Sequence, residues 1–447
     1  MTKTNFFSKK NLLIKTIALI FMLSFFLPFS NIANADTPTK ISTETTTNDV
    51  GPNLSAKYAI SMDLKTGEVI YSKNADAKAY PASLTKLMTA LLFAEHANKT
   101  DEITFTKEAS IQPPYSLHSN WPGVSITVGQ KMSGEDVMKA LLMFSANDAA
   151  YMIADYVGGN SKNFANMMNE EAKKLGMKDT HFVTANGLQD ADHYTTAYDL
   201  AILLKAAFAN PWVKETMETK NSSIMINGKR VDLVNRNELL GKDGNIAGKT
   251  GTTNDAGNCL ASVYNRDGRE ILGIILFSND MHTPDNRYKD MEAMMNYSYS
   301  AKPEVFIKSG QSIKDVTLKY KLFGFFGPTK EITVPVTVDQ DVMMYNNKFN
   351  KNHTDITFNS NGDSAWKASS KDSLDLTLVS GQYKTTVKGS IGISKFDLIK
   401  ANIFVYLGVL VGIALIVLII LFIIRTINKR RSRRSRYSSY SNYRRRY

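Results

Sequence analysis

The spacing of apolar residues changes along the chain, and each change predicts a different kind of element. The segments "KYAISMDL" and "EVIYSK" alternate apolar and polar residues on either side of a turn that contains Gly67, which is typical of two strands. In the segment that follows, Leu84, Leu87 and Leu91 recur at intervals of three and four residues. This spacing predicts a helix with one buried face.

Helical patterns continue until strand patterns return after Gly248. "GEDVMKALLMFSANDAAYMIAD" predicts two short helices broken near residues 144–148, and a further helix ends at Gly176. Another helix begins with Thr195 or Thr196 as its N-cap. "GNCLASVYNRD" and "REILGIILFSND" are strand candidates. Strands at both ends with helices between them predict an α+β domain over residues 54–300.

Residues 302–396 show a different pattern. "IKDVTLKYKL", "KEITVPVTV", "SLDLTLVS" and "YKTTVKGSI" alternate with the period of strands, and helical patterns are absent. We therefore expect a second, small all-β domain.

Both ends of the chain carry membrane-related signals. Lysines, an apolar run over 17–29 and the small residues of "ANA" predict a signal peptide over 1–35, with an uncleaved anchor as the alternative. A Thr-rich linker follows over 36–53. Residues 401–424 contain no charge and predict a transmembrane helix. The strongly basic tail, 425–447, is expected to stay in the cytoplasm, which places the domains outside the cell.

The net charge of +12 suggests nucleic-acid binding until its distribution is considered. Residues 1–35 carry four lysines and residues 425–447 carry ten Lys or Arg, with no acid in either segment, so the body between them is slightly negative. Nucleic acid is therefore not an expected partner. The single cysteine, Cys259, allows no internal disulfide, and its position does not suit a lipoprotein anchor.

Ser83 and Lys86 lie three residues apart at the start of the predicted helix of "PASLTKLMTA". Residues at i and i+3 share one helix face, so a lysine in this position could act as the base for a serine nucleophile. Its amine would have to be neutral, which requires burial or a nearby positive charge. The spacing alone is weak evidence, because Ser364 and Lys367 in "SAWK" repeat it without a helical pattern or later partners.

Two further motifs follow in order along the chain. "FSANDAA" contains Ser145 and Asn147, and "IAGKTGTTNDAGNCLAS" contains Lys249, Thr250 and Gly251. With this ordered set, the chain resembles the serine D-alanyl-D-alanine carboxypeptidases, the low-molecular-mass penicillin-binding proteins. The segments "LGMKDTHFVTANGL" and "TAYDLA" also look like those of the family. An earlier Lys-Thr-Gly, at residues 65–67, lies in the predicted hairpin turn before the serine and is not expected to be a site.

The resemblance implies a fold and a set of roles. The fold is the penicillin-binding/β-lactamase-like transpeptidase domain, an antiparallel sheet with helices. Ser83 would attack the carbonyl of the penultimate D-Ala of a peptidoglycan stem pentapeptide, and Lys86 would accept its proton. Ser145 would relay a proton to the leaving amine. Asn147 would orient the base and the substrate amide.

The Lys-Thr-Gly segment would bind the substrate's terminal carboxylate. Lys249 would supply positive potential, which also helps to keep the base neutral, while Thr250 and Thr252 would offer hydroxyls. The backbone N–H groups of Ser83 and Thr252 would form the oxyanion hole. Arg287 in "PDNRYKD" is a further candidate for the carboxylate, with an ordinary surface arginine as the alternative.

We therefore predict a membrane-anchored enzyme that trims cell-wall peptides, needs no cofactor or metal, and is acylated by β-lactams. A β-lactamase and a non-catalytic cell-wall-binding scaffold are the alternatives. The chain lacks a Glu-x-x-x-Asn deacylation loop of the class A kind, and its complete set of motifs argues against loss of catalysis. The simple C-terminal anchor and lack of disulfides favour a Gram-positive envelope. A full span departs from the amphipathic anchor that is usual in the family.

Overall fold

A computed structural model describes residues 51–443 except 280–284, 359–363 and 372, with side chains described up to residue 433. The predicted signal peptide and almost all of the predicted linker lie outside the described residues.

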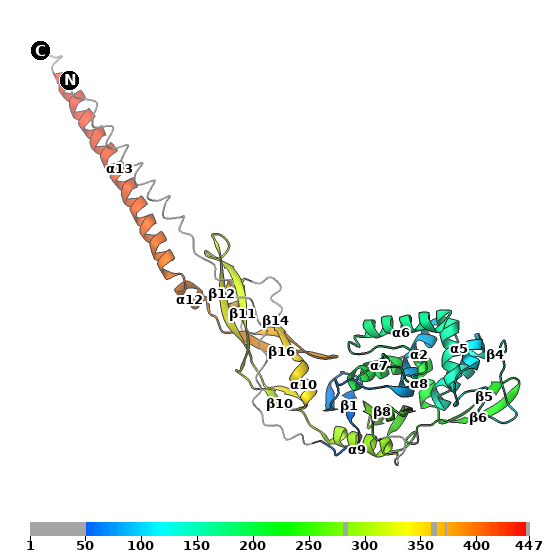
Figure 1. The fold of residues 1–447 in the computed structure, drawn as a ribbon. Helices are drawn as coiled ribbons and strands as arrows, with labels where there is room; N and C mark the ends of the chain where they lie inside the picture. The colour runs from blue at the N-terminus through cyan, green and yellow to red at the C-terminus, as the bar shows by residue number, and fades with distance from the viewer. Residues whose placement is uncertain (1–50, 280–284, 359–363, 372, 444–447) are drawn as a thin grey trace. The chain divides into compact units, whose positions relative to one another are not determined.

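A five-stranded antiparallel sheet, in the order β2-β1-β9-β8-β7, forms the centre of the first domain (Figure 1). Its strands are β1 (Tyr58–Asp63), β2 (Val69–Lys73), β7 (Asn245–Thr253), β8 (Gly257–Arg266) and β9 (Arg269–Leu276). Helices cover both faces of β8 and β9, so both strands are buried along most of their length. This explains their nearly continuous apolar sequences. Strand β7 lies at an edge of the sheet.

Helix α9 (Arg287–Ser300) packs on one face of the sheet through Met291, Met294 and Met295. Gly273 of β9 permits this close approach, because a Cβ there would lie 2.2 Å from the Met295 Cε. A larger hydrophobic core, which includes helix α7 (Ala197–Ala209), lies on the other face. The remaining helices of this domain are η1 (Ala82–Thr85), α2 (Lys86–His96), α3 (Lys107–Ser110), α4 (Gly134–Lys139), η2 (Ala140–Phe144), α5 (Asn147–Gly158), α6 (Ser161–Leu175), α7 (Ala197–Ala209) and α8 (Pro211–Glu218).

Two small two-stranded sheets complete the domain: β3 (Glu102–Thr104) pairs with β4 (Lys131–Ser133), and β5 (Asn221–Ile226) pairs with β6 (Lys229–Val234). Several predicted helix ends are confirmed. The Thr196 side chain accepts a hydrogen bond from the Asp199 N–H and caps α7. Helix α6 ends at Gly176, whose φ of 84° is disfavoured for residues that carry a Cβ. The predicted break near residues 144–148 falls between η2 and α5.

The second sheet has the order β11-β12-β16-β15-β14. The strands of this region are β10 (Glu304–Ile307), β11 (Ser312–Lys321), β12 (Thr329–Val338), β13 (Val342–Met344), β14 (Thr354–Phe358), β15 (Leu374–Ser380) and β16 (Tyr383–Ile391). This β-rich region also contains two short helices that no helical pattern indicated, α10 (Lys348–His353) and α11 (Ala365–Ala368). These helices are too short to show a periodic pattern, and their N-caps, Asn347 and Ser364, were their only local signals.

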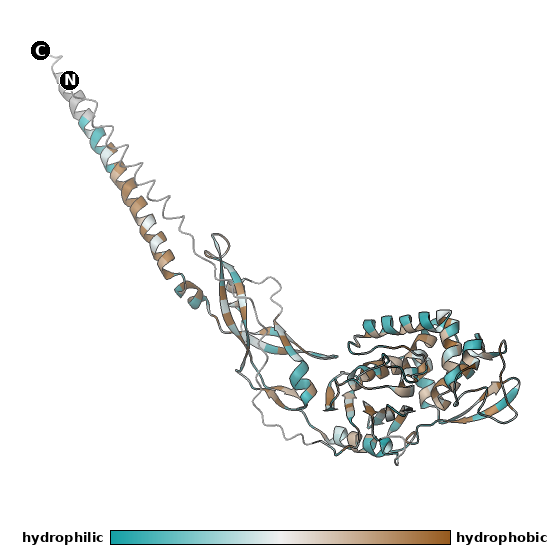
Figure 2. Cartoon of the chain, in the orientation of Figure 1, coloured by the Kyte–Doolittle hydropathy of each residue, from teal (hydrophilic) through white to brown (hydrophobic). Residues whose placement is uncertain are grey.

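Two helices follow the second sheet: α12 (Lys395–Lys400) and α13 (Ile403–Tyr443). Within α13, Ile403–Arg433 is long and apolar enough to cross a membrane, with a mean hydropathy of 3.5 in its most apolar window. Figure 2 shows hydrophobic residues in the part of α13 that follows α12 and hydrophilic residues farther along. Its length and composition make the C-terminal helix a candidate membrane anchor.

Candidate active site

Ser83 and Lys86 lie where η1 passes into α2. Ser83 is in the 3₁₀ turn, Lys86 is the first residue of the α-helix, and their Oγ and Nζ atoms are 2.8 Å apart. The Ser83 side chain is half-buried, whereas Lys86 is fully buried. The predicted pair is thus in hydrogen-bonding contact, with the serine on the more accessible side.

Three oxygen atoms surround the Lys86 amine. Besides Ser83 Oγ, its Nζ donates to Asn147 Oδ1 at 3.0 Å and to the carbonyl oxygen of Asn186 at 2.9 Å. Burial, assisted by the positive charge of Arg236, lowers the pKa of Lys86 to about 7. A substantial fraction of this lysine is therefore neutral near neutral pH and able to accept a proton.

Ser145 and Lys249 form a second serine–lysine pair. Ser145 lies between η2 and α5 in the left-handed region, at a φ of 73°, which is uncommon for a residue other than glycine. The Lys249 Nζ donates to Ser145 Oγ at 2.9 Å and to the carbonyl oxygen of Thr250 at 2.7 Å. Burial, and then the nearby charge of Lys86, lower the pKa of Lys249 well below its ordinary value. Two buried ammonium groups in one site oppose each other's protonation.

Asn147 links the two pairs. It begins α5 two residues after Ser145, and its side-chain amide donates to the carbonyl oxygen of Pro114 at 2.9 Å. That bond orients the amide so that its oxygen faces the Lys86 amine. The Ser-x-Asn motif therefore supplies the Asn147 oxygen as an acceptor for Lys86 and the Ser145 hydroxyl as an acceptor for Lys249.

Strand β7 brings the Lys-Thr-Gly segment against η1. A Cβ at Gly251 would lie 3.1 Å from the Ser83 backbone nitrogen, so glycine allows the strand to approach the serine closely. Lys249 and Thr250 are buried, while Thr252 is exposed. The Thr252 hydroxyl donates to Asn258 Oδ1 at 3.1 Å.

Arg287, at the start of α9, contacts this strand from behind. Its guanidinium donates to the carbonyl oxygens of Gly251 at 3.0 Å and Cys259 at 3.2 Å, and to Thr252 Oγ1 at 2.9 Å. It also bonds to the side chains of Asn258 and Asp285. The alternative of an ordinary surface arginine does not describe it, because Arg287 is buried and ties β7 to β8. Its donors are directed to these protein groups.

Our sequence reasoning missed Arg236. This exposed residue lies on the loop after β6, and its guanidinium stacks 4.6 Å from the centroid of the Tyr115 ring. The sequence led us to expect that Lys249 helps to keep Lys86 neutral, and the structure adds Arg236 as a further positive group that lowers the pKa of Lys86. An isolated arginine far from the motifs in sequence gave no local signal.

The second missed contribution comes from the "TANGL" segment. Its Asn186 carbonyl binds the Lys86 amine, and Gly187, at a φ of 82°, packs against η1. A Cβ on Gly187 would lie 1.9 Å from the carbonyl oxygen of Ala82 and 2.7 Å from Thr85 Oγ1. The sequence of this segment resembles that of the family, but it did not indicate a role for Asn186 or Gly187.

Replacing Gly187 by alanine is expected to displace η1 and lower the free energy of unfolding by about 2–4 kcal/mol, from the clash and the positive φ together. Gly159 is a matched control, because its φ is 75° and a Cβ there would meet nothing within 4 Å. Gly159→Ala is expected to cost only about 1 kcal/mol. Denaturant unfolding measures both variants. Equal losses would show that the approach to η1 does not matter.

The pH dependence of serine acylation should follow Lys86. Only neutral lysine accepts a proton, so the second-order rate of acylation by a fluorescent penicillin is expected to rise with pH through about 7. Arg236→Gln removes a positive charge, raises the pKa of Lys86 and moves this limb to higher pH. We expect a shift of less than about one unit, because the arginine is exposed and screened. Arg236→Lys should leave the limb in place. An unmoved limb in Arg236→Gln would mean that burial alone sets the pKa.

The other motif copies lie away from this arrangement. Lys65, Thr66 and Gly67 form the turn between β1 and β2, as predicted. Ser364 caps α11 by accepting from the Lys367 N–H. Among the described residues, no group of three or more His, Cys, Asp or Glu side chains is placed to hold a metal ion.

Comparisons with known proteins show the family to which the chain belongs. Residues 43–279 match the family of D-alanyl-D-alanine carboxypeptidases. The chain is 28% identical over 267 residues to the D-alanyl-D-alanine carboxypeptidase DacF of Bacillus subtilis, and 33% identical over 270 residues to DacC of Escherichia coli. Each alignment covers 59% of this chain, and 67% and 65% of the respective relative. The chain therefore spans only about two thirds of these relatives' length.

Solved structures show the same fold. A mutant of the DD-transpeptidase of Streptomyces K15 matches with a TM-score of 0.51 at 28% identity, over 56% of this chain and 100% of that chain. A penicillin-binding protein homolog from Mycobacterium tuberculosis matches with a TM-score of 0.52 at 24% identity, over 57% of this chain and 95% of that chain. The predicted penicillin-binding α+β fold is confirmed.

Proposed function

Because this chain belongs to the D-alanyl-D-alanine carboxypeptidase family, we propose that it removes the terminal D-Ala from peptidoglycan stem pentapeptides through an acyl-enzyme on Ser83. The observation that carries the proposal is the 2.8 Å contact between Ser83 Oγ and the buried Lys86 amine, whose pKa is lowered to about 7. A neutral lysine in contact with a serine hydroxyl is the arrangement that makes the hydroxyl a nucleophile.

Acylation begins when the Ser83 oxygen attacks the carbonyl carbon of the penultimate D-Ala and its proton passes to the Lys86 nitrogen. The carbonyl oxygen becomes an oxyanion, which the backbone N–H groups of Ser83 and Thr252 stabilise. The close approach of β7 to η1, permitted by Gly251, supports this pairing of donors. Asn147 holds the base and orients the substrate amide.

Collapse of the intermediate breaks the peptide bond. Ser145 gives a proton to the leaving amine of the terminal D-Ala and recovers one through the site's lysines; its 2.9 Å contact with the Lys249 amine supports this route. Free D-Ala leaves, and water then hydrolyses the ester, which regenerates the Ser83 hydroxyl. A β-lactam would acylate Ser83 in the same way, by opening of its ring, and the resulting ester would be hydrolysed slowly.

The substrate's terminal carboxylate is bound by Lys249, whose protonation the approaching anion favours, and by the hydroxyls of Thr250 and Thr252. Arg287 contributes to carboxylate binding mainly as a positioning residue, because its guanidinium already bonds the Thr252 hydroxyl and the β7 backbone. Its charge adds to the positive potential that attracts the carboxylate.

We further propose that α13 spans the cell membrane once, with both domains outside and the basic tail inside. The positive flank of the apolar segment supports this orientation. Cell-wall peptides would then be within reach of the enzyme, as expected for a Gram-positive envelope.

Release of D-Ala from a synthetic pentapeptide ending in D-Ala-D-Ala tests the proposed function. The full-length protein in detergent is expected to release one D-Ala per peptide, whereas the same peptide ending in L-Ala should remain intact. Fast hydrolysis of nitrocefin without release of D-Ala would instead support the β-lactamase alternative. Neither activity, together with peptidoglycan binding, would support the scaffold.

A further inference from the structure

The tip of the hairpin that joins β11 to β12 exposes aromatic residues. Its sequence, "LFGFFGP", contains Phe323, Phe325 and Phe326, of which Phe325 is 89% exposed and Phe326 is 53% exposed. Contiguous exposed apolar side chains of this size mark a surface that contacts a membrane or another protein.

Several backbone donors of the tip are bonded within it. The Leu322 N–H donates to the Pro328 carbonyl at 3.1 Å, and the Phe323 N–H donates to the Phe326 carbonyl at 3.1 Å. The rings of Phe323 and Phe326 stack with their centroids 5.0 Å apart. Internal bonding of this kind is what a segment needs in order to enter a medium that offers no hydrogen bonds.

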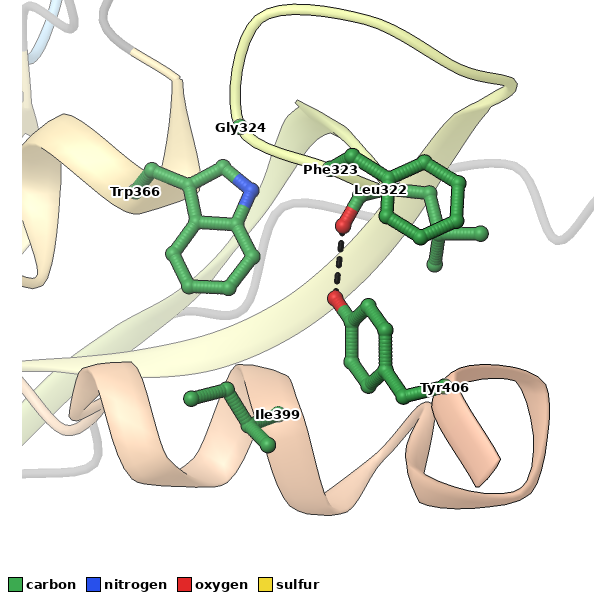
Figure 3. Close-up of a pocket in the computed structure, with 6 residues that line it drawn as sticks. All are labelled: Leu322, Phe323, Gly324, Trp366, Ile399 and Tyr406. Atoms are coloured by element: carbon green, nitrogen blue, oxygen red, sulfur yellow. Dashed lines mark hydrogen bonds between the residues drawn. The ribbon is translucent and has the colours of Figure 1, made fainter. Parts of the chain in front are cut away.

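The tip lies beside the first turn of α13. The Tyr406 hydroxyl of α13 donates to the Leu322 carbonyl oxygen at 2.6 Å, and its ring centroid is 5.7 Å from that of Phe323 (Figure 3). One turn earlier, the Asn402 amide donates to the Tyr320 hydroxyl at 2.8 Å. The hairpin is thus bonded to the helix at the level where its apolar segment begins.

An apolar pocket opens between the tip and the two C-terminal helices (Figure 3). Its volume is about 430 Å³, and its lining residues are Leu322, Phe323, Gly324, Trp366, Ile399 and Tyr406. On α12, the neighbouring Phe396 is 70% exposed and is flanked by the exposed Lys395 and Lys400. Aromatic rings with lysines at their margin are typical of the boundary between the hydrocarbon core and the headgroups of a bilayer.

We propose that the β11–β12 tip and α12 insert into the membrane leaflet next to the second domain, with phospholipid acyl chains in the pocket. This inference rests on the proposed membrane span of α13, and it adds a second membrane contact to that span. The observation that selects lipid as the occupant is continuity, because the exposed phenylalanines adjoin the turn of α13 that would enter the bilayer. Two attachment points would restrict tilting of the second domain relative to the helix.

The experiment uses the full-length protein in nanodiscs of phosphatidylcholine and phosphatidylglycerol. A nitroxide is attached at Phe325→Cys, and its accessibility to oxygen and to a water-soluble nickel complex is measured by electron paramagnetic resonance. The native Cys259 is buried and its pKa is raised to about 11, so it should not react, and the unmutated protein measures any background labelling. Labelling by fluorescent penicillin checks that each variant is folded.

Two control positions separate this proposal from the membrane span itself. Asp315→Cys is exposed on the same hairpin ten residues before the tip, and Leu410→Cys lies within the apolar part of α13. We expect the label at 325 to favour oxygen over nickel, as at 410, and the label at 315 to favour nickel.

A label at 325 that behaves like 315, while 410 is in lipid, overturns the second contact and leaves the span intact. A label at 410 in water overturns the span. Spin–spin broadening at 325 in discs with two copies, absent with one, would assign the tip to a second copy of the chain and overturn the lipid proposal.

Discussion

Ser83→Ala is expected to abolish labelling by fluorescent penicillin and to lower the rate of D-Ala release by about 10⁴-fold or more, because no other group can form the acyl ester. The side chain is small and half-buried, so its loss should leave the melting temperature nearly unchanged. Labelling is read on a gel, and D-Ala is measured with an amino-acid oxidase assay.

The chain provides a matched control for this variant. Ser364 has the same spacing to a lysine, but its hydroxyl caps α11 by accepting from the Lys367 N–H. Ser364→Ala should therefore cost about 1 kcal/mol of stability and leave acylation unchanged. Labelling that persists in Ser83→Ala, or disappears in Ser364→Ala, would contradict the assignment of the nucleophile.

Lys86→Met is expected to reduce the second-order rate of acylation by about 10³-fold, since it removes the general base but keeps an unbranched apolar side chain of similar length. The oxygens of Asn147 and Asn186 lose their donor, so we also expect a loss of about 1–3 kcal/mol in stability. Rates are therefore compared at a temperature at which both proteins are fully folded. Lys367→Met, at the control motif, should change neither the rate nor the pH profile.

The pH dependence of the acylation rate that remains in Lys86→Met is a sharper test than the magnitude of the rate loss. If Lys86 is the base, the rise in acylation through about pH 7 should disappear along with most of the rate. A variant that keeps the wild-type limb at a lower rate would show that another group, such as Lys249, takes the serine proton. Retention of more than about one tenth of the rate would contradict the assignment outright.

The sequence was sufficient for those parts of the site whose residues follow one another at fixed spacing on regular elements. Ser83 and Lys86 meet because a turn of helix brings i and i+3 together, and the Lys249 segment reaches them because it lies on an edge strand. The order of motifs along the chain also distinguished this serine from Ser364. Buried strands such as β8 could be predicted because they are apolar almost throughout.

The contributions that sequence reasoning missed depend on tertiary contacts without a local pattern. Arg236 acts on Lys86 through space from a loop 150 residues later. The Asn186 carbonyl is a backbone atom, so no side-chain type reveals it. Arg287 was singled out as a carboxylate ligand, but only the structure could reveal that its donors hold the strand. The short helices α10 and α11 were not predicted, because one or two turns are too short to show a helical period of apolar residues.

The measurement that tests the central claim most directly is peptide mapping of the penicillin-treated full-length protein by mass spectrometry. The account predicts a single acyl adduct per chain, on Ser83. An adduct on Ser145, on Ser364 or on any other residue, or no adduct under conditions in which the protein releases D-Ala, would contradict it.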